Sequence, residues 1–198
     1  MDCKAPQPLA EIGLNSMSLS DSQLDEQIQK RELICFARSG IDSNKIQGFP
    51  VGYSSDLLLL RYVFDFHIDG LLLIRREDIC DSSCRSTDKF QRKMLEDEKV
   101  LKDGHFQMHH NIESFFTFLD GLGERKIVIV ENEIPPKQEF YIGRVVAVDP
   151  KAVNVHEFSG AGKWAADATE VSLGDITSCQ IETNYINFYA RHFQRATQ

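Results

Sequence analysis

The chain has 198 residues, of which 42% are hydrophobic, and a formal net charge of −8. This length suits one ordinary domain or two small ones, and the apolar content is sufficient for a buried core. No run approaches the roughly 18 apolar residues that cross a bilayer, and the first residues include an acid and a proline where a secretion signal needs basic and apolar residues. We therefore expect a cytoplasmic protein with no membrane partner.

The first part of the chain predicts a leader, a helix and a set of strands. Residues 1–19 contain prolines and serines, so we expect a disordered leader. A short helix is predicted over Asp21–Gln29, with Ser20 or Asp21 as its cap. Apolar, β-branched and aromatic runs predict strands over Leu33–Ala37, Ile46–Tyr53, Leu57–Phe64 and Leu71–Arg75, and a short last strand after Asp78-Ile79. With turns at Ser54–Asp56 and Ile68–Gly70, these elements form a first module over residues 20–85.

A linker over residues 86–110 separates this module from a second one of the same plan. The sequence of this linker predicts a charged helix over Ser86–Asp103. The second module, residues 111–198, is expected to begin with a helix over Ile112–Leu119 capped by Asn111 and to end with a helix over Tyr185–Gln194. Its strands are predicted over Lys126–Val130, Phe140–Val148, Ala152–Phe158 and Thr169–Leu173, with a short last strand after Asp175-Ile176.

The two modules align with each other as a repeat. When Gly48 is set against Gly143, 95 positions later, Leu58 and Leu60 fall on Val153 and Val155. Further along, two extra residues in the second copy shift the offset to 97, and the pair Asp78-Ile79 then falls on Asp175-Ile176. A period this long in two copies indicates duplication of a domain. The alternative is that two strand-rich segments align by chance.

The acidic charge lies mostly outside the strands. Residues 1–30 and 96–125 carry net charges of −3 and −4, whereas residues 31–95 and 126–198 carry +1 and −2. Near-neutral modules neither favour nor exclude a polyanionic partner. The five cysteines, an odd number in a chain without an export signal, predict free thiols, and the Cys80/Cys84 spacing does not predict a zinc site. We expect no metal and no cofactor.

A helix followed by five short strands in about seventy residues resembles the Sm-like barrel. In the second module, Gly143, Asp149 and Asn154 also resemble the first motif of that family. The resemblance implies RNA binding by Asp149 and Asn154. The spacing departs from the family pattern, because four residues and not three separate this pair, and the arginine of the second motif is missing before Gly174. Turn chemistry is the alternative role for Asp149. The whole chain also resembles uncharacterised bacterial proteins, which implies no activity.

Other polar residues give weaker patterns. Arg75 and Arg76 end a predicted strand and could contact phosphate, but Glu77-Asp78 follows them and could neutralise them. His105, His109 and His110 are close in sequence, yet the expected loop around them favours solvated side chains over a metal site. Trp164 is expected to anchor the core. No catalytic motif is found, so no catalytic residue is predicted.

These observations predict a mainly β protein with short flanking helices, arranged as two tandem small Sm-like β-barrels. The first hypothesis for its function is a non-enzymatic interaction or scaffold protein that binds a protein partner or associates with itself. The expected oligomeric state is a monomer or a dimer. The alternative is an RNA-binding protein of Sm-like type, with Asp149, Asn154, Arg75 and Arg76 as binding residues and no DNA partner. An enzyme without a recognisable motif is the third hypothesis.

Overall fold

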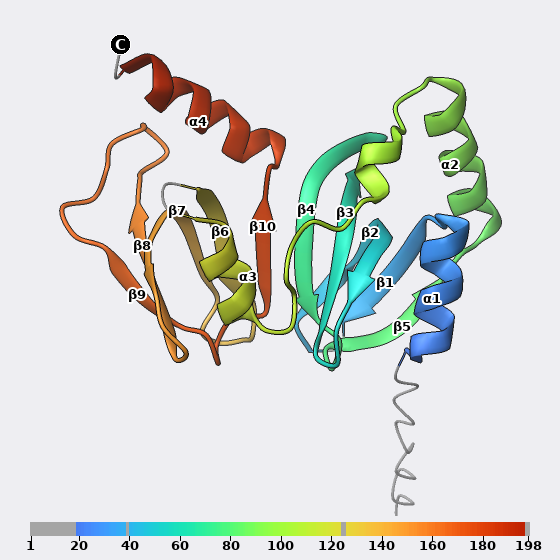
Figure 1. The fold of residues 1–198 in the computed structure, drawn as a ribbon, viewed down its shortest axis with the longest axis horizontal. Helices are drawn as coiled ribbons and strands as arrows, with labels where there is room; N and C mark the ends of the chain where they lie inside the picture. The colour runs from blue at the N-terminus through green and yellow to red at the C-terminus, as the bar shows by residue number, and fades with distance from the viewer. Residues whose placement is uncertain (1–18, 39, 124–125, 197–198) are drawn as a thin grey trace, which may run out of the picture.

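The computed structural model describes residues 19–38, 40–123 and 126–196, so the predicted leader lies almost entirely outside the described residues. Within these ranges the fold is mainly β, as predicted, and the strands form one antiparallel sheet (Figure 1). The order of the strands in this sheet is β5-β1-β2-β3-β4-β10-β6-β7-β8-β9. None of the described helices is long and apolar enough to span a membrane.

The elements fall into two halves with a connection between them. The first half contains α1 (Asp21–Lys30), β1 (Ile34–Arg38), β2 (Asp42–Tyr53), β3 (Leu57–Phe64), β4 (His67–Arg75) and β5 (Ile79–Ser83). The connection contains α2 (Ser86–Asp97) and the short 3-10 helix η1 (Asp103–Phe106). The second half contains α3 (Phe115–Gly121), β6 (Ile127–Asn132), β7 (Glu139–Val148), β8 (Ala152–Glu157), β9 (Thr169–Ser172), β10 (Ser178–Ile181) and α4 (Asn184–Ala196).

The two halves share one strand order. The first runs β5-β1-β2-β3-β4 and the second runs β10-β6-β7-β8-β9. The aligned glycines also occupy matching places: a Cβ at Gly48 would lie 2.9 Å from the carbonyl oxygen of Arg61, and one at Gly143 would lie 2.2 Å from that of His156. The register of β2 with β3 shifts just beyond Gly48, and that of β7 with β8 shifts just beyond Gly143. Each glycine therefore admits the close backbone approach at a bend of its strand.

The halves are joined where β10 pairs with β4 on one side and with β6 on the other, a junction we call the seam. The largest hydrophobic cluster crosses it. Leu59 and Leu73 of the first half lie in this cluster with Val130, Val155 and Cys179 of the second. Because the main core is common to both halves, they form one packed unit.

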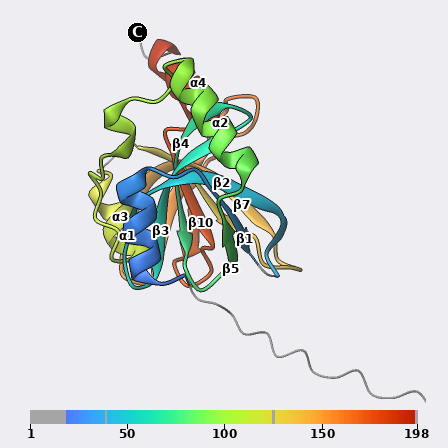
Figure 2. The ribbon, with the colours of Figure 1, turned by 90° about the vertical axis from the view of Figure 1, so that its right-hand side faces the viewer.

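Helices cover further apolar surfaces of the sheet. Leu24 of α1 belongs to a cluster with alternate residues of β3, Leu58 and Leu60. Leu95 of α2 packs with Phe49, and Ile186 and Phe193 of α4 pack with the strands of the second half. α1 and α2 lie on the outer side of the first half, toward the viewer in Figure 2, and Figure 1 shows α4 at the opposite side of the molecule. The strand β3 is thus buried on both faces, which explains its uninterrupted run of leucines.

The strands do not close into barrels. Within the described sheet, β5 and β9 are its two edges, and no ladder connects either of them to the far end of its own half. The predicted closure into two barrels is therefore not seen in the strand pairing. The reason is that β4, which ends the spatial order of strands in the first half, pairs across the seam with β10 and not with β5.

Two local predictions were wrong. The chain turns at Asp65 and Phe66, both with positive φ, and not at Ile68–Gly70, which already lies in β4. Gly70 serves another purpose, since its φ is +76° and a Cβ would lie 2.3 Å from the carbonyl oxygen of Ile181. The helix predicted from Ile112 begins at Phe115, because Ser114 and not Asn111 caps it, accepting a hydrogen bond from the Thr117 amide at 3.1 Å.

The other elements lie close to their predicted ranges. α1 is capped by Ser20, β3 has the predicted bounds, and α4 extends the predicted last helix by one residue at its start and two at its end. The linker helix is shorter than predicted, because α2 ends at Asp97 and Lys99 adopts a positive φ. A separate turn of 3-10 helix then follows.

Candidate binding site at the seam

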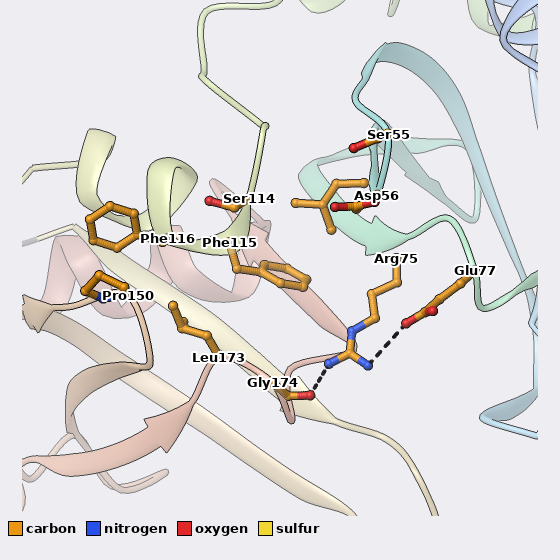
Figure 3. A pocket seen from close by; sticks show the side chains of 11 residues that line it. Ser55, Asp56, Arg75, Glu77, Ser114, Phe115, Phe116, Pro150, Leu173 and Gly174 are labelled. Atoms are coloured by element: carbon orange, nitrogen blue, oxygen red, sulfur yellow. Dashed lines mark hydrogen bonds and ion pairs between the residues drawn. The ribbon is translucent and has the colours of Figure 1, made fainter.

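A cavity of about 540 Å³ opens at the seam, at the end of the sheet where β3 begins and β4 ends. Both halves build its wall (Figure 3). The residues that line it are Ser55, Asp56, Leu57, Arg75, Glu77, Ser114, Phe115, Phe116, Pro150, Leu173 and Gly174. Its volume lies in the range of cavities that take a small molecule or an inserted side chain.

The apolar side of the cavity comes from the start of α3 and from two turns of the second half. The Ser114 cap sets the first turn of α3, so that Phe115 is buried and Phe116 is half-buried. Leu173 lies beside Phe115, and Pro150 lies beside Phe116 (Figure 3). These four side chains form a continuous apolar surface on the side of the second half.

Arg75 forms the opposite wall and ties the halves together. Its Nη2 donates a hydrogen bond to the Gly174 carbonyl oxygen at 2.5 Å, and its Nη1 lies 3.7 Å from the Glu77 carboxylate. Glu77 and Asp56 are exposed at the rim. The cavity therefore has an apolar interior, one engaged arginine and two acidic side chains at its mouth.

A second polar cluster lies on the seam near the ends of β1 and β6. Arg38, of which only 4% is exposed, donates from both terminal nitrogens to the Glu133 carboxylate, at 2.6 and 2.5 Å. Thr177 donates to the same carboxylate at 2.7 Å. Burial alone would raise the pKa of Glu133, but hydrogen bonding and charge from Arg38 hold that pKa below its ordinary value.

The pKa values of two neighbouring carboxyl groups shift in the opposite direction, upward. Burial, and then the charge of Glu133, raise the pKa of Glu131, although Ser178 and Gln180 donate hydrogen bonds to it. Burial also raises the pKa of Asp78. A smaller cavity of about 310 Å³ is lined in part by Glu131 and Glu133. The seam thus holds one strong ion pair beside acids that are less readily ionised.

Comparison with known proteins found no family model, no curated protein and no solved structure that matches the chain. The interpretation of the site therefore depends on its own geometry.

The structure places the predicted binding residues in four different roles. Asp149 accepts hydrogen bonds from the amides of Lys151 and Ala152, at 2.7 and 3.1 Å, and so shapes the turn between β7 and β8. Asn154 is a half-buried position within β8, opposite Ala147. Arg75 lines the seam cavity, and the neighbour of Asp149, Pro150, lines it too.

Arg76 extends toward α1 and away from the cavity lining. It donates to the carbonyl oxygens of Ser54 and Leu19 and pairs with Asp21 at 2.7 Å. Its guanidinium also lies 5.2 Å from the centre of the Tyr53 ring. This arginine holds the start of α1 against the sheet, so the two consecutive arginines do not act on one ligand.

The histidines and cysteines give no shared site. Among the described residues, no three His, Cys, Asp or Glu side chains gather in a way that could hold a metal ion. Burial lowers the pKa values of His105 and His110, which lie along the connection to α3. The four cysteines in the described ranges are unpaired, and burial raises the pKa of the Cys179 thiol far above its usual value.

Sequence reasoning missed most of the cavity. The sequence places Phe115 in a helix, Leu173 in a strand and Glu77 beside two arginines, and no local pattern links the three. One signal was available for the polar cluster: Arg38 and Glu133 carry opposite charges 95 positions apart, the offset that also separates Gly48 from Gly143.

Proposed function

We propose that the protein is a cytoplasmic, non-enzymatic interaction protein, built from two Sm-like modules that arose by duplication and are joined edge to edge, and that it binds a protein partner at the seam cavity. The observation that carries this proposal is the cavity's composition: an apolar interior contributed by α3 and Leu173, with acidic side chains at the mouth. The shared strand order, the matching glycines and the matching register shifts support the duplication.

The chemistry of the cavity favours a peptide segment with an apolar anchor beside a basic residue. An aromatic or aliphatic side chain would contact Phe115, Phe116 and Leu173. A lysine or arginine next to it would lie near Asp56 and Glu77. Anchors of this kind, inserted into a pocket, supply much of the binding energy of protein interfaces, and flanking charges add specificity.

Less supports the alternative of RNA binding through Asp149 and Asn154. The Asp149 carboxylate already accepts two backbone hydrogen bonds. The seam cavity places two carboxylates at its mouth, which would repel a phosphate backbone. No observation on the described residues specifically favours an enzymatic role.

The test is selection of peptides from a random display library on the purified chain. We expect enriched peptides to carry an apolar residue next to lysine or arginine. The double variant Asp56→Lys with Glu77→Lys should lose these peptides and select acidic neighbours of the anchor. The variant Glu98→Lys with Asp120→Lys makes the same change of net charge at exposed positions away from the cavity lining and should select the original peptides. Enrichment unaffected by the first variant, or no enrichment over an unrelated protein, would overturn the proposal.

A further inference from the structure

The helix α4 has two chemically different faces. Its inner face packs on the second half through Ile186 and Phe193, both buried. Its outer side carries aromatic and basic side chains at helical spacing: Tyr185, Phe188, Arg191, His192 and Arg195. Phe188 is 66% exposed and Tyr185 is 50% exposed, so two rings lie on the outer side of the helix in addition to its buried apolar face.

The charge of this region is opposite to that of the protein as a whole. The helix contains two arginines and neither aspartate nor glutamate, while the chain has a net charge of −8. Within the described ranges, neither Arg191 nor Arg195 makes an ion pair. Arg191 lies over the ring of Phe188, 4.6 Å from its centre, and the Nε of Arg195 donates to the Arg191 carbonyl oxygen. No carboxylate of the described residues pairs with either guanidinium, so both can meet an anion from outside that part of the chain.

A hollow lies between this helix and the loop that joins β8 to β9. It has a volume of about 270 Å³, and its lining consists of Gly160, Ala161, Gly162, Phe188, Tyr189 and His192. The Tyr189 hydroxyl donates to the Gly160 carbonyl oxygen at 2.9 Å, which fixes the loop against the helix. Because the loop side has almost no side chains, the rings of Phe188 and His192 border an open space. The next residue of the loop, Lys163, is exposed and adds a further positive charge.

We propose that the outer face of α4 and the Gly160–Lys163 loop bind single-stranded nucleic acid. A base would stack on Phe188 at the hollow, and the adjoining phosphates would contact Arg191, Arg195 and Lys163. Binding of single strands combines these two elements, aromatic platforms for the bases and cations for the backbone. The arginine over the phenylalanine adds a cation–π partner on the same platform.

This site is separate from the seam cavity and does not depend on the proposed protein partner. It also differs from the surface implied by Asp149 and Asn154, since neither of those residues lines the hollow. An anionic membrane is the main competing occupant. It is disfavoured because the apolar face of α4 is buried on the sheet, whereas an interfacial helix inserts that face between lipids.

The test is fluorescence anisotropy of labelled twelve-nucleotide oligo(U) and oligo(dT) with the full chain at 50 mM salt. We expect binding of the single strands and weaker binding of a duplex of the same length. Phe188→Ala should weaken binding roughly 5- to 100-fold, the range for loss of one stacked base. Arg191→Gln with Arg195→Gln should lower the slope of log affinity against log salt by about 1.4. Oligo(U) and oligo(dT) distinguish a site that uses the 2′-hydroxyl from one that does not.

The matched control is Phe90→Ala, which removes a phenylalanine that is 63% exposed on α2, in the connection between the halves. It should leave the affinity unchanged. No binding at 50 µM protein would overturn the proposal, and so would binding that survives both α4 variants. Binding of phosphatidylserine vesicles in place of oligonucleotides, lost in Phe188→Ala, would overturn it in favour of a membrane. Circular dichroism of each variant verifies that the fold is retained, which we expect because the altered side chains are exposed.

Discussion

Replacing Arg38 by methionine should destabilise the protein by about 3–5 kcal/mol at neutral pH, the usual cost of removing one partner from a buried ion pair. The side chain of Arg38 is 3% exposed and that of Glu133 is 19% exposed. Without the guanidinium, the Glu133 carboxylate would keep only hydroxyl donors, among them Thr177, beside the partly buried Glu131. The charge would then be buried with little compensation, which places the expected cost in this range.

The loss of stability caused by Arg38→Met should depend on pH in a defined direction. Arg38 lowers the pKa of Glu133 in the folded protein, so the pair contributes stability at neutral pH that is lost as the pH falls through the lowered pKa. In the variant, burial without the arginine would raise that pKa, and the variant would gain stability as the pH falls toward 4. The difference between wild type and variant should therefore be largest near pH 7 and smaller at pH 4.

Urea denaturation at pH 7.5 and pH 4, followed by Trp164 fluorescence and by far-ultraviolet circular dichroism, measures both effects. Replacing the whole pair by Arg38→Met with Glu133→Met should restore most of the lost stability, because no unpaired charge remains. Lys93→Met removes an exposed cation from a pair on α2 and should leave the unfolding curve in place. A loss below about 1 kcal/mol for Arg38→Met, or an equal loss at both pH values, would refute the reasoning.

Three further predictions concern the seam. Glu131→Gln should be more stable than wild type at pH 8 and lose this advantage in acid, because a carboxyl whose folded pKa is raised costs stability when it ionises; urea titrations across pH measure this. Gly70→Ala should destabilise more than Gly40→Ala in thermal melts, since both have positive φ but only a Cβ at Gly70 would meet a carbonyl oxygen; equal losses would contradict this. Native alkylation followed by mass spectrometry should leave Cys179 unlabelled while Cys80 and Cys84 react, and rapid labelling of Cys179 would show that the seam opens.

The sequence predicted elements well where a local pattern is enough to determine them. The run Leu57–Phe64 is a strand because its apolar residues follow the turn at Ser54, whose hydroxyl accepts from the Leu57 amide. The glycine at position 70 misled the assignment of a turn, because its purpose is a close contact with Ile181, more than a hundred residues away. A glycine that serves a distant contact cannot be distinguished by local pattern from one that serves a turn.

The candidate site was less predictable for a related reason. Arg75 was identified as a possible binding residue, but its partner Gly174 is 99 positions away and is brought to it by the pairing of β4 with β10. The pairing partners of a strand depend on the whole fold, and an apolar strand pattern fits many neighbours. The hollow beside α4 was missed because Phe188 looks like a core residue until the inner face of the helix is known.

The position of β10 has a consequence for the chain while it is being made. When β1 to β5 have left the ribosome, the outer edge of β4 has no partner until residues 178–181 also emerge. The residues of that edge, Leu71, Leu72, Leu73 and Ile74, are all apolar and all buried in the finished sheet. An unpaired apolar edge is a template on which other chains can form strands. A nascent or shortened chain that lacks β10 would therefore expose an unpaired apolar strand edge, so stalled synthesis or cleavage before residue 178 should give insoluble product.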